Sequence, residues 1–112
     1  RLNLNASSGA DIAVTEAALG QATINASSGS DIEIDGSADS VDAEASSGSS
    51  IDAGDLVART VTAGASSGAD IAVHATARIS ADASSGGDID VYGNPAEREL
   101  DESSGGDVSF ID

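Results

Sequence analysis

The sequence predicts an all-β fold, a parallel β-helix (β-solenoid) of about six coils. Three observations support this prediction. A tetrapeptide ending in Ser-Ser-Gly recurs at a nearly fixed period, apolar residues alternate with polar ones on both sides of it, and most of these apolar residues are small or β-branched. A period of roughly 20 residues is typical of solenoids, in which each repeat needs a neighbour to cover its apolar edge. Alternation at two rather than 3.6 residues argues against helices.

The repeat divides the whole chain. Ala-Ser-Ser-Gly begins at Ala6, Ala26, Ala45, Ala65 and Ala83, and Glu-Ser-Ser-Gly begins at Glu102. The successive steps are 20, 19, 20, 18 and 19 residues, so a coil has roughly 19 residues. We therefore expect one β-solenoid domain over residues 1–112, with equivalent residues of successive coils stacked about 4.8 Å apart.

A strand is expected before each tetrapeptide, because the apolar residues there recur with period two. Two residues before the tetrapeptide stand Leu4, Ile24, Ala43, Ala63, Ala81 and Leu100. Four residues before it stand Leu2, Ala22, Val41, Val61, Ile79 and Arg98. These two sets are expected to face the interior. A coil of this size encloses a narrow interior, so small side chains are enough to fill it.

The tetrapeptide itself is expected to form a corner. Ser8, Ser28, Ser47, Ser67, Ser85 and Ser104 continue the inward phase, and we expect their hydroxyls to stack as a buried ladder from coil to coil. Gly9, Gly29, Gly48, Gly68, Gly86 and Gly105 follow them and extend the ladder. Glycine at this point indicates positive φ or a tight backbone approach.

A second strand, about five residues long, is expected after each corner. Its inward positions hold Ile12, Ile32, Ile51, Ile71, Ile89 and Val108, followed two residues later by Val14, Ile34, Ala53, Val73, Val91 and Phe110. The remainder of each period, such as residues 36–40 and 54–60, is expected to be a looser segment that absorbs the variation in coil length.

The composition excludes several classes of function. Twenty acidic residues against four arginines and no lysine give a net charge of -16, which argues against nucleic acid as a partner. The chain has no cysteine for disulfides, and its single histidine leaves too few nitrogen ligands for an ordinary structural zinc site. No apolar run is long enough to predict a membrane span.

The two ends of the predicted stack differ. Tyr92, Arg98, Glu102 and Phe110 break the pattern of the last coil, as expected where a stack closes its end. The first coil begins directly with the apolar pattern and leaves an uncapped edge. We therefore expect self-association end to end, with another copy or with missing upstream coils.

The Ser-Ser-Gly-x-Asp-Ile-x-Val units, and above all residues 84–95 followed by 103–108, resemble the end of a head GIN domain from the family of auto-transporter adhesins. The resemblance covers essentially the whole chain. It implies a right-handed parallel β-helix from an extracellular or cell-envelope protein, and adhesion without catalytic residues that can be transferred. Members of the family are usually longer, so the resemblance also implies that the domain is truncated at its N-terminal end.

An aspartate follows two residues after most corner glycines, at Asp11, Asp31, Asp70, Asp88 and Asp107. Stacked carboxylates repel one another, so something must offset their charge. Three interpretations compete. The aspartates could accept hydrogen bonds from corner N–H groups or serine hydroxyls, they could bind calcium weakly, or two of them could act as the pair of carboxylates of a glycosidase. Ser67, Asp70 and His74 share one coil, but His74 falls in the outward phase, which argues against a catalytic triad.

The sequence therefore favours a non-enzymatic surface or extracellular module, a rigid acidic β-solenoid with a structural or adhesive role. Its ligand would be a component of another surface or a glycan, and no cofactor is expected apart from calcium. The alternatives are a carbohydrate-active β-helix enzyme, which rests on fold analogy alone, and a calcium-binding repeat module.

Overall fold

The computed structural model describes residues 2–103 and 105–111, which form eight strands in one parallel sheet. The strands are β1 (Leu2–Ala6), β2 (Asp11–Ala26), β3 (Asp31–Ala45), β4 (Ser50–Ala65), β5 (Asp70–Ala83), β6 (Asp88–Tyr92), β7 (Glu97–Glu102) and β8 (Asp107–Ile111). Their order is β1-β2-β3-β4-β5-β6-β8, and β7 pairs with β5. Among these residues there is no helix of the length and apolar character that a membrane crossing requires.

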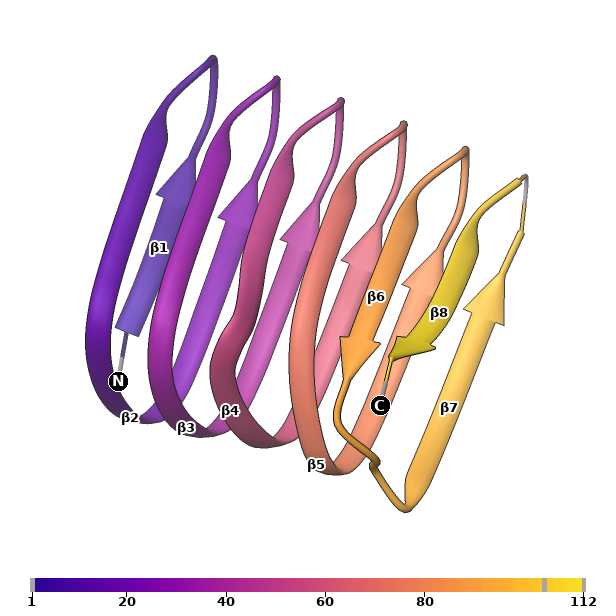
Figure 1. The fold of residues 1–112 in the computed structure, drawn as a ribbon. Coiled ribbons are helices and arrows are strands. Elements are labelled where there is room, and N and C mark those ends of the chain that lie inside the picture. The colour runs from indigo at the N-terminus through magenta and orange to yellow at the C-terminus, as the bar shows by residue number, and fades with distance from the viewer. Residues whose placement is uncertain (1, 104, 112) are drawn as a thin grey trace.

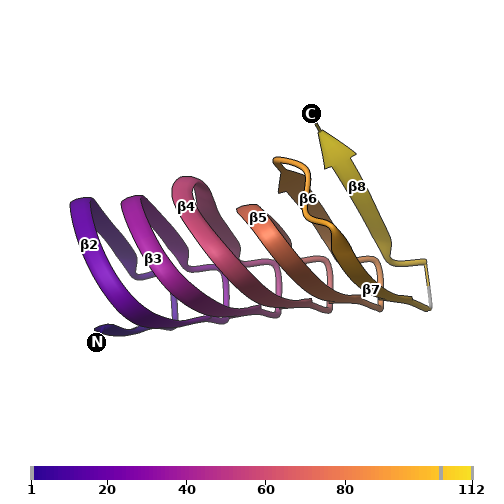
Figure 2. The ribbon, with the colours of Figure 1, turned by 90° about the horizontal axis from the view of Figure 1, so that it is seen from below.

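Each coil is a narrow loop with two legs, one sharp corner and one rounded bend (Figure 1). The first leg follows the Ser-Ser-Gly corner, the bend reverses the chain, and the second leg leads to the next corner. In Figure 1 the chain descends in front, ascends behind and advances from left to right, which makes the solenoid right-handed. Figure 2 shows the coils in a single row, with β1 at one end and β7 and β8 at the other.

The predicted stacking of equivalent residues is confirmed. On the first leg Ile32 pairs with Ile51, Ile51 with Ile71 and Ile71 with Ile89. On the second leg the alanine that begins each tetrapeptide pairs with its equivalent in the next coil from Ala6 to Ala83. In-register parallel pairing places equivalent side chains on the same side of the sheet, so each set forms a continuous file.

The interior is filled almost entirely by aliphatic side chains from the two legs. Ile24, Ile34 and Ile79 are fully buried, and the alanines of the second leg are no more than 4% exposed. Leu56, from the bend of β4, also reaches the interior. Burying one isoleucine contributes roughly 1.5–3 kcal/mol, so the stack is stabilised mainly by these files.

The prediction of five-residue strands separated by looser segments is wrong for the middle coils. Strands β2 to β5 are 14–16 residues long and run through the bend, because backbone pairing with the neighbouring coils continues there. Shifts in register within β2, β3 and β4 absorb the differences in coil length. Only the last coil divides into short strands, β6 and β7, on either side of Pro95, which has no N–H for the ladder.

Candidate functional site

The corner is a tight turn built from two residues with left-handed backbone. Ser28 has φ of 58° and Gly29 has φ of 76°, and Ser30 N–H donates to the Ser27 carbonyl at 3.3 Å. Two successive positive φ values with this hydrogen bond define a type I′ turn. The same conformation occurs at Ser8, Ser47, Ser67 and Ser85, with φ between 52° and 59°. Ser104 lies outside the described residues.

The predicted ladder of serine hydroxyls facing the interior is wrong. Ser8, Ser28, Ser47, Ser67 and Ser85 are exposed, because the left-handed turn carries their side chains out of the stack. The corners are nevertheless joined through the backbone: the N–H groups of Gly9, Gly29, Gly48 and Gly68 donate to the carbonyl of the equivalent serine in the next coil, at 3.0–3.1 Å. The Ser–Gly ladder is therefore a ladder of peptide groups.

The buried hydroxyls belong to Ser30 and Ser49, which the alternation of apolar residues does not reveal. The Ser49 hydroxyl lies 2.9 Å from the Ala26 carbonyl of the preceding coil and 2.7 Å from the Ser46 carbonyl, and it accepts the Ser46 N–H at 3.0 Å. Ser30 repeats this pattern one coil earlier. The sequence could have indicated a buried position here, because only small residues occupy it in the successive coils: Ala10, Ser30, Ser49, Ala69, Gly87 and Gly106.

The predicted aspartates lie in one file on the outside of the first leg. Asp11, Asp31, Asp70, Asp88 and Asp107 are all exposed, and Ser50 interrupts the file between Asp31 and Asp70. Asp70 of β5 lies in register with Asp88 of β6, so the two carboxyl groups are neighbours in the file. Partial burial, then the charges of Asp88 and Asp90, raise the pKa of Asp70 above its usual value.

Together with Glu33, Asp52 and Asp90 on the next outward file, these aspartates form an acidic surface that we call the Asp face. A groove of about 570 Å³ crosses it between Ser50 and Asp107. Within the described part of the chain, no three His, Cys, Asp or Glu side chains gather in a way that could hold a metal ion. Weak calcium binding along the Asp face stays a prediction.

Ser67, Asp70 and His74 do not form a triad. His74 is half-buried on β5 and lies in register with Tyr92 of β6. Asp70 precedes it by four positions on the extended strand, which corresponds to roughly 13 Å. The file neighbour of Asp70 is Asp88 of the next coil.

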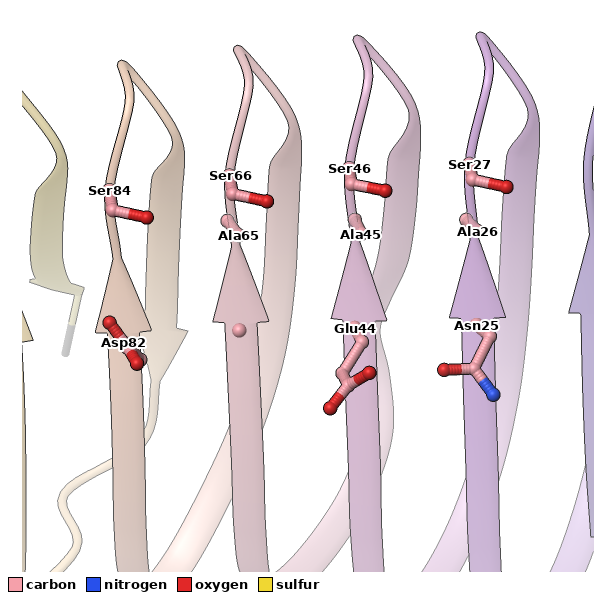
Figure 3. Close-up of a pocket in the computed structure, with 11 residues that line it drawn as sticks. Asn25, Ala26, Ser27, Glu44, Ala45, Ser46, Ala65, Ser66, Asp82 and Ser84 are labelled. Atoms are coloured by element: carbon pink, nitrogen blue, oxygen red, sulfur yellow. The ribbon is translucent and has the colours of Figure 1, made fainter.

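The outside of the second leg carries a different site, which we call the serine groove. It is a shallow groove of about 500 Å³, and its polar lining comprises Asn25, Ser27, Glu44, Ser46, Gly64, Ser66, Asp82 and Ser84. Figure 3 shows the hydroxyls of the four serines pointing in the same direction, in a row above Asn25, Glu44 and Asp82. These serines are the first of each Ser-Ser pair and are half-buried.

A glycine opens the middle of the serine groove. Asn25, Glu44, Gly64 and Asp82 follow one another in register on β2 to β5. Glu44 and Asp82 are thus two coils apart, or roughly 9–10 Å, with no side chain between them. The groove therefore offers hydroxyl, amide and carboxylate groups around a recess, an arrangement suited to hydrogen bonding with a polar ligand.

Comparison with known proteins identifies a family and a solved structure. The family model described as "Putative auto-transporter adhesin, head GIN domain" matches residues 1–95. A crystal structure of a putative adhesin from Bacteroides fragilis superposes with a TM-score of 0.84 at 20% sequence identity. The alignment covers 97% of this chain and 53% of that chain, so this chain spans about half the length of its structural neighbour.

Among curated proteins, none matches this sequence. The structural neighbour shares the fold, and the family model covers the β-solenoid from β1 to the connection after β6. The resemblance proposed from the Ser-Ser-Gly units is confirmed by the family match. The chain belongs to the family of the head GIN domain of auto-transporter adhesins.

Proposed function

We propose that this chain is a non-enzymatic adhesion module that acts outside the cell or on its envelope. The main observation behind the proposal is that the two sides of the sheet carry different kinds of side chain. The interior is aliphatic, whereas the Asp face and the serine groove present acidic and hydroxyl groups outward in regular files. The family description and the name of the structural neighbour, both adhesins, support this role.

The same construction supports the proposal of a rigid, acidic module. Strands β3 and β4 pair with both neighbouring coils along almost their whole length, which resists bending between coils. A net charge of -16 without lysine keeps the exposed faces from associating with one another. Outward groups therefore keep a fixed spacing of about 4.8 Å along the stack, which a repetitive ligand can match.

The serine groove is the surface that we propose for ligand contact, and the ligand class is a glycan. Serine hydroxyls and the Asn25 amide donate and accept hydrogen bonds, and Glu44 and Asp82 accept them. A sugar ring carries hydroxyl groups that can satisfy both kinds of partner. The recess at Gly64 gives room for it to approach the backbone.

A filled groove tests this proposal. The variant Gly64→Val places a side chain in the recess without strain, because Gly64 has no positive φ and an added Cβ would lie 3.9 Å from its nearest neighbour, Glu44 Cγ. Beads coated with the chain should adhere to a glycan-coated surface, and the variant should lose most of this adhesion. The matched control Gly20→Val, on the bend of β2 with open space around it, should adhere like the parent.

The carbohydrate-active enzyme is the competing function, and it depends on the Asp70–Asp88 pair. Glycans incubated with the chain should be recovered unchanged. Turnover that disappears in both Asp70→Asn and Asp88→Asn would replace the adhesion proposal by a glycosidase. Adhesion that neither Gly64→Val nor Gly20→Val alters would remove the serine groove as the contact surface.

A further inference from the structure

The two ends of the stack differ in what fills the interior. At the N-terminal end, Leu4, Ile12 and Val14 pack partly buried against the core. At the other end, β7 pairs with β5 so that Arg98 lies in register with Ile79 and Glu102 with Ala83. Ile79 and Ala83 are fully buried interior residues. In the last described coil, two charged residues therefore stand in register with interior residues, and both are exposed because no described coil follows them.

Arg98 is exposed and reaches across the open end of the stack, from the second leg to the first. Its guanidinium carbon lies 4.3 Å from the centroid of the Phe110 ring on β8. Its Nη2 donates to Asn94 Oδ1 at 2.8 Å, and its Nε donates to the Pro95 carbonyl at 3.2 Å. These contacts fix the guanidinium over the end of the aliphatic core, where the cation–π contact and both hydrogen bonds stabilise it.

Glu102 closes the same end from the corner side. Asp107 N–H donates to the Gly87 carbonyl of the preceding coil. Because alternate residues of a strand direct their N–H groups to opposite sides, the N–H of Val108 points away from the stack. Glu102 Oε2 accepts this N–H at 2.7 Å. The Glu102 carboxylate thus accepts the hydrogen bond of a backbone N–H group that would otherwise pair with a following coil.

We propose that Arg98 and Glu102 prevent a second copy of this chain from stacking on β7 and β8. The first coil of a second copy would continue the files of Leu100, Val108 and Phe110 with Leu4, Ile12 and Val14, in the coil-to-coil register that this chain repeats throughout. Stacking would bury a guanidinium and a carboxylate against aliphatic side chains, which is unfavourable. Charged residues that point inward are a known way to protect the edge of a sheet.

The partner excluded from β7 and β8 is a second copy of this chain, whose first coil continues the same files. Such head-to-tail stacking joins two different surfaces of the same molecule. Such contacts do not close on themselves and generate open filaments. Arg98 and Glu102 therefore oppose the growth of such a filament at the end formed by β7 and β8. Both residues lie beyond residue 95, where the match to the family model ends.

Replacement of both charges tests the proposal. In Arg98→Val with Glu102→Ala, the two positions carry the residues that their files hold at Val61 and Ala65. The molar mass of this variant, measured by light scattering, should rise continuously with concentration, and electron microscopy should show straight filaments one stack wide. The parent chain should keep the same molar mass over the same range of concentrations.

Matched controls separate this effect from a general loss of charge. Glu99→Val with Asp101→Ala removes two outward charges from the same strand and should leave the mass unchanged. Leu4→Lys added to the associating variant places a charge on the receiving end and should reverse the growth. If the first variant does not fold, as judged by circular dichroism, Arg98→Met with Glu102→Gln removes the charges at nearly constant length. Folded variants that keep the parent's mass, or equal growth in the Glu99 and Asp101 control, would overturn the proposal.

Discussion

The sharp corner and the rounded bend close the same coil in opposite ways. The corner has one conformation in the five coils whose corner serine is described, with a left-handed serine, a left-handed glycine and one hydrogen bond across the turn. The bend differs from coil to coil and contains the register shifts of β2, β3 and β4. A solenoid therefore needs one fixed point per coil to set the register, and the opposite end can vary in length.

The corner also shows how a small side chain sets local geometry. The N–H of the residue after the glycine lies 3.3 Å from the carbonyl that it contacts at Ala10, Ser30 and Ser49, 3.1 Å at Ala69, and 2.9 Å at Gly87 and Gly106. A Cβ built on Gly87 would lie 2.5 Å from the Ala65 carbonyl oxygen. The turn is thus tightest where the residue has no side chain, and glycine there is required by close approach.

A single inserted residue should separate the two regions most clearly. An alanine inserted between Gly48 and Ser49 shifts the following leg by one residue and turns Ile51 and Ala53 toward solvent. We expect a loss of about 3 kcal/mol or more in the free energy of unfolding, because both side chains leave the core. An alanine inserted after Gly36, on the bend of β3, gives that coil the 20-residue step of its neighbours and should cost less than about 1 kcal/mol.

Urea denaturation followed by circular dichroism would measure both insertions. Equal losses of stability for the two variants would show that the bend fixes the register as strictly as the corner. The comparison would then lose its basis.

Glycine to alanine changes test the same contrast without changing length. Gly48 has φ of 75°, so Gly48→Ala should lower the free energy of unfolding by about 1–2 kcal/mol. Gly20, on the bend of β2, has no positive φ and open space around it. Gly20→Ala should raise stability by about 0.4–1 kcal/mol, because it restricts the unfolded chain. Thermal melts should show opposite shifts, and shifts of the same sign would contradict the assignment of strain to the corner.

The buried hydroxyl of the corner should contribute a smaller amount. Ser49→Ala removes the hydrogen bonds to Ala26 and Ser46 and should lower the free energy of unfolding by about 1 kcal/mol. Ala69→Ser introduces the hydroxyl at the equivalent position of the next coil and should raise it by up to about 1 kcal/mol. Ser37→Ala, at an exposed position on the bend of β3, should change it by less than about 0.5 kcal/mol. An Ala69→Ser variant less stable than its parent would show that this corner has no room for a hydroxyl.

The smallest expected effect is the pH dependence of stability that Asp70 causes. Asp70 is the first residue of the strand after its corner. The pKa of Asp70 is raised in the folded state by burial and by the charges of Asp88 and Asp90, so folding favours its protonated form. Stability should therefore increase as pH falls through the folded pKa of Asp70, and this gain should end below its unfolded pKa. Asp70→Asn should be more stable than the parent at neutral pH and should flatten this part of the pH profile.

Melting curves between pH 3 and 7, a range of about four units around the ordinary pKa of aspartate, would measure this profile. Asp39→Asn, on the bend of β3, removes the same charge away from the corners and should leave the slope unchanged. An identical slope in the parent and in Asp70→Asn would show that the ionisation of Asp70 is not its cause.

The files of stacked residues on the two legs could be predicted because two sequence periods give the same alignment. The repeat of roughly 19 residues aligns the coils, and the period of two assigns faces, so Ile51 and Ile71 could be placed together without coordinates. The period of two fails at the corner, because two left-handed residues reverse the chain between Ser47 and Ser49. The inward hydroxyls were therefore assigned to Ser28 and Ser47, whereas Ser30 and Ser49 carry them. The equivalent position of the other corners is alanine or glycine.

The bends were less predictable for a different reason. Glycine, aspartate and serine around Gly36 and Gly54 are typical of loops, yet pairing with neighbouring coils keeps these segments extended. The serine groove could have been found from the register, since Asn25, Glu44, Gly64 and Asp82 occupy one outward position. Its depth depends on the absence of a side chain at Gly64, which alternation of apolar residues does not reveal.

The direction of the hydrogen bonds gives the stack a characteristic response to tension. Bonds between coils run along the row of coils, and β1 and β8 lie at opposite ends of it (Figure 2). A pull on the two ends would load the terminal coil first and detach one coil at a time. Each detached coil of about 19 residues would lengthen the chain to roughly 60 Å in place of a rise of about 4.8 Å. An attachment built from such coils would yield in steps and dissipate a sudden load instead of breaking at once.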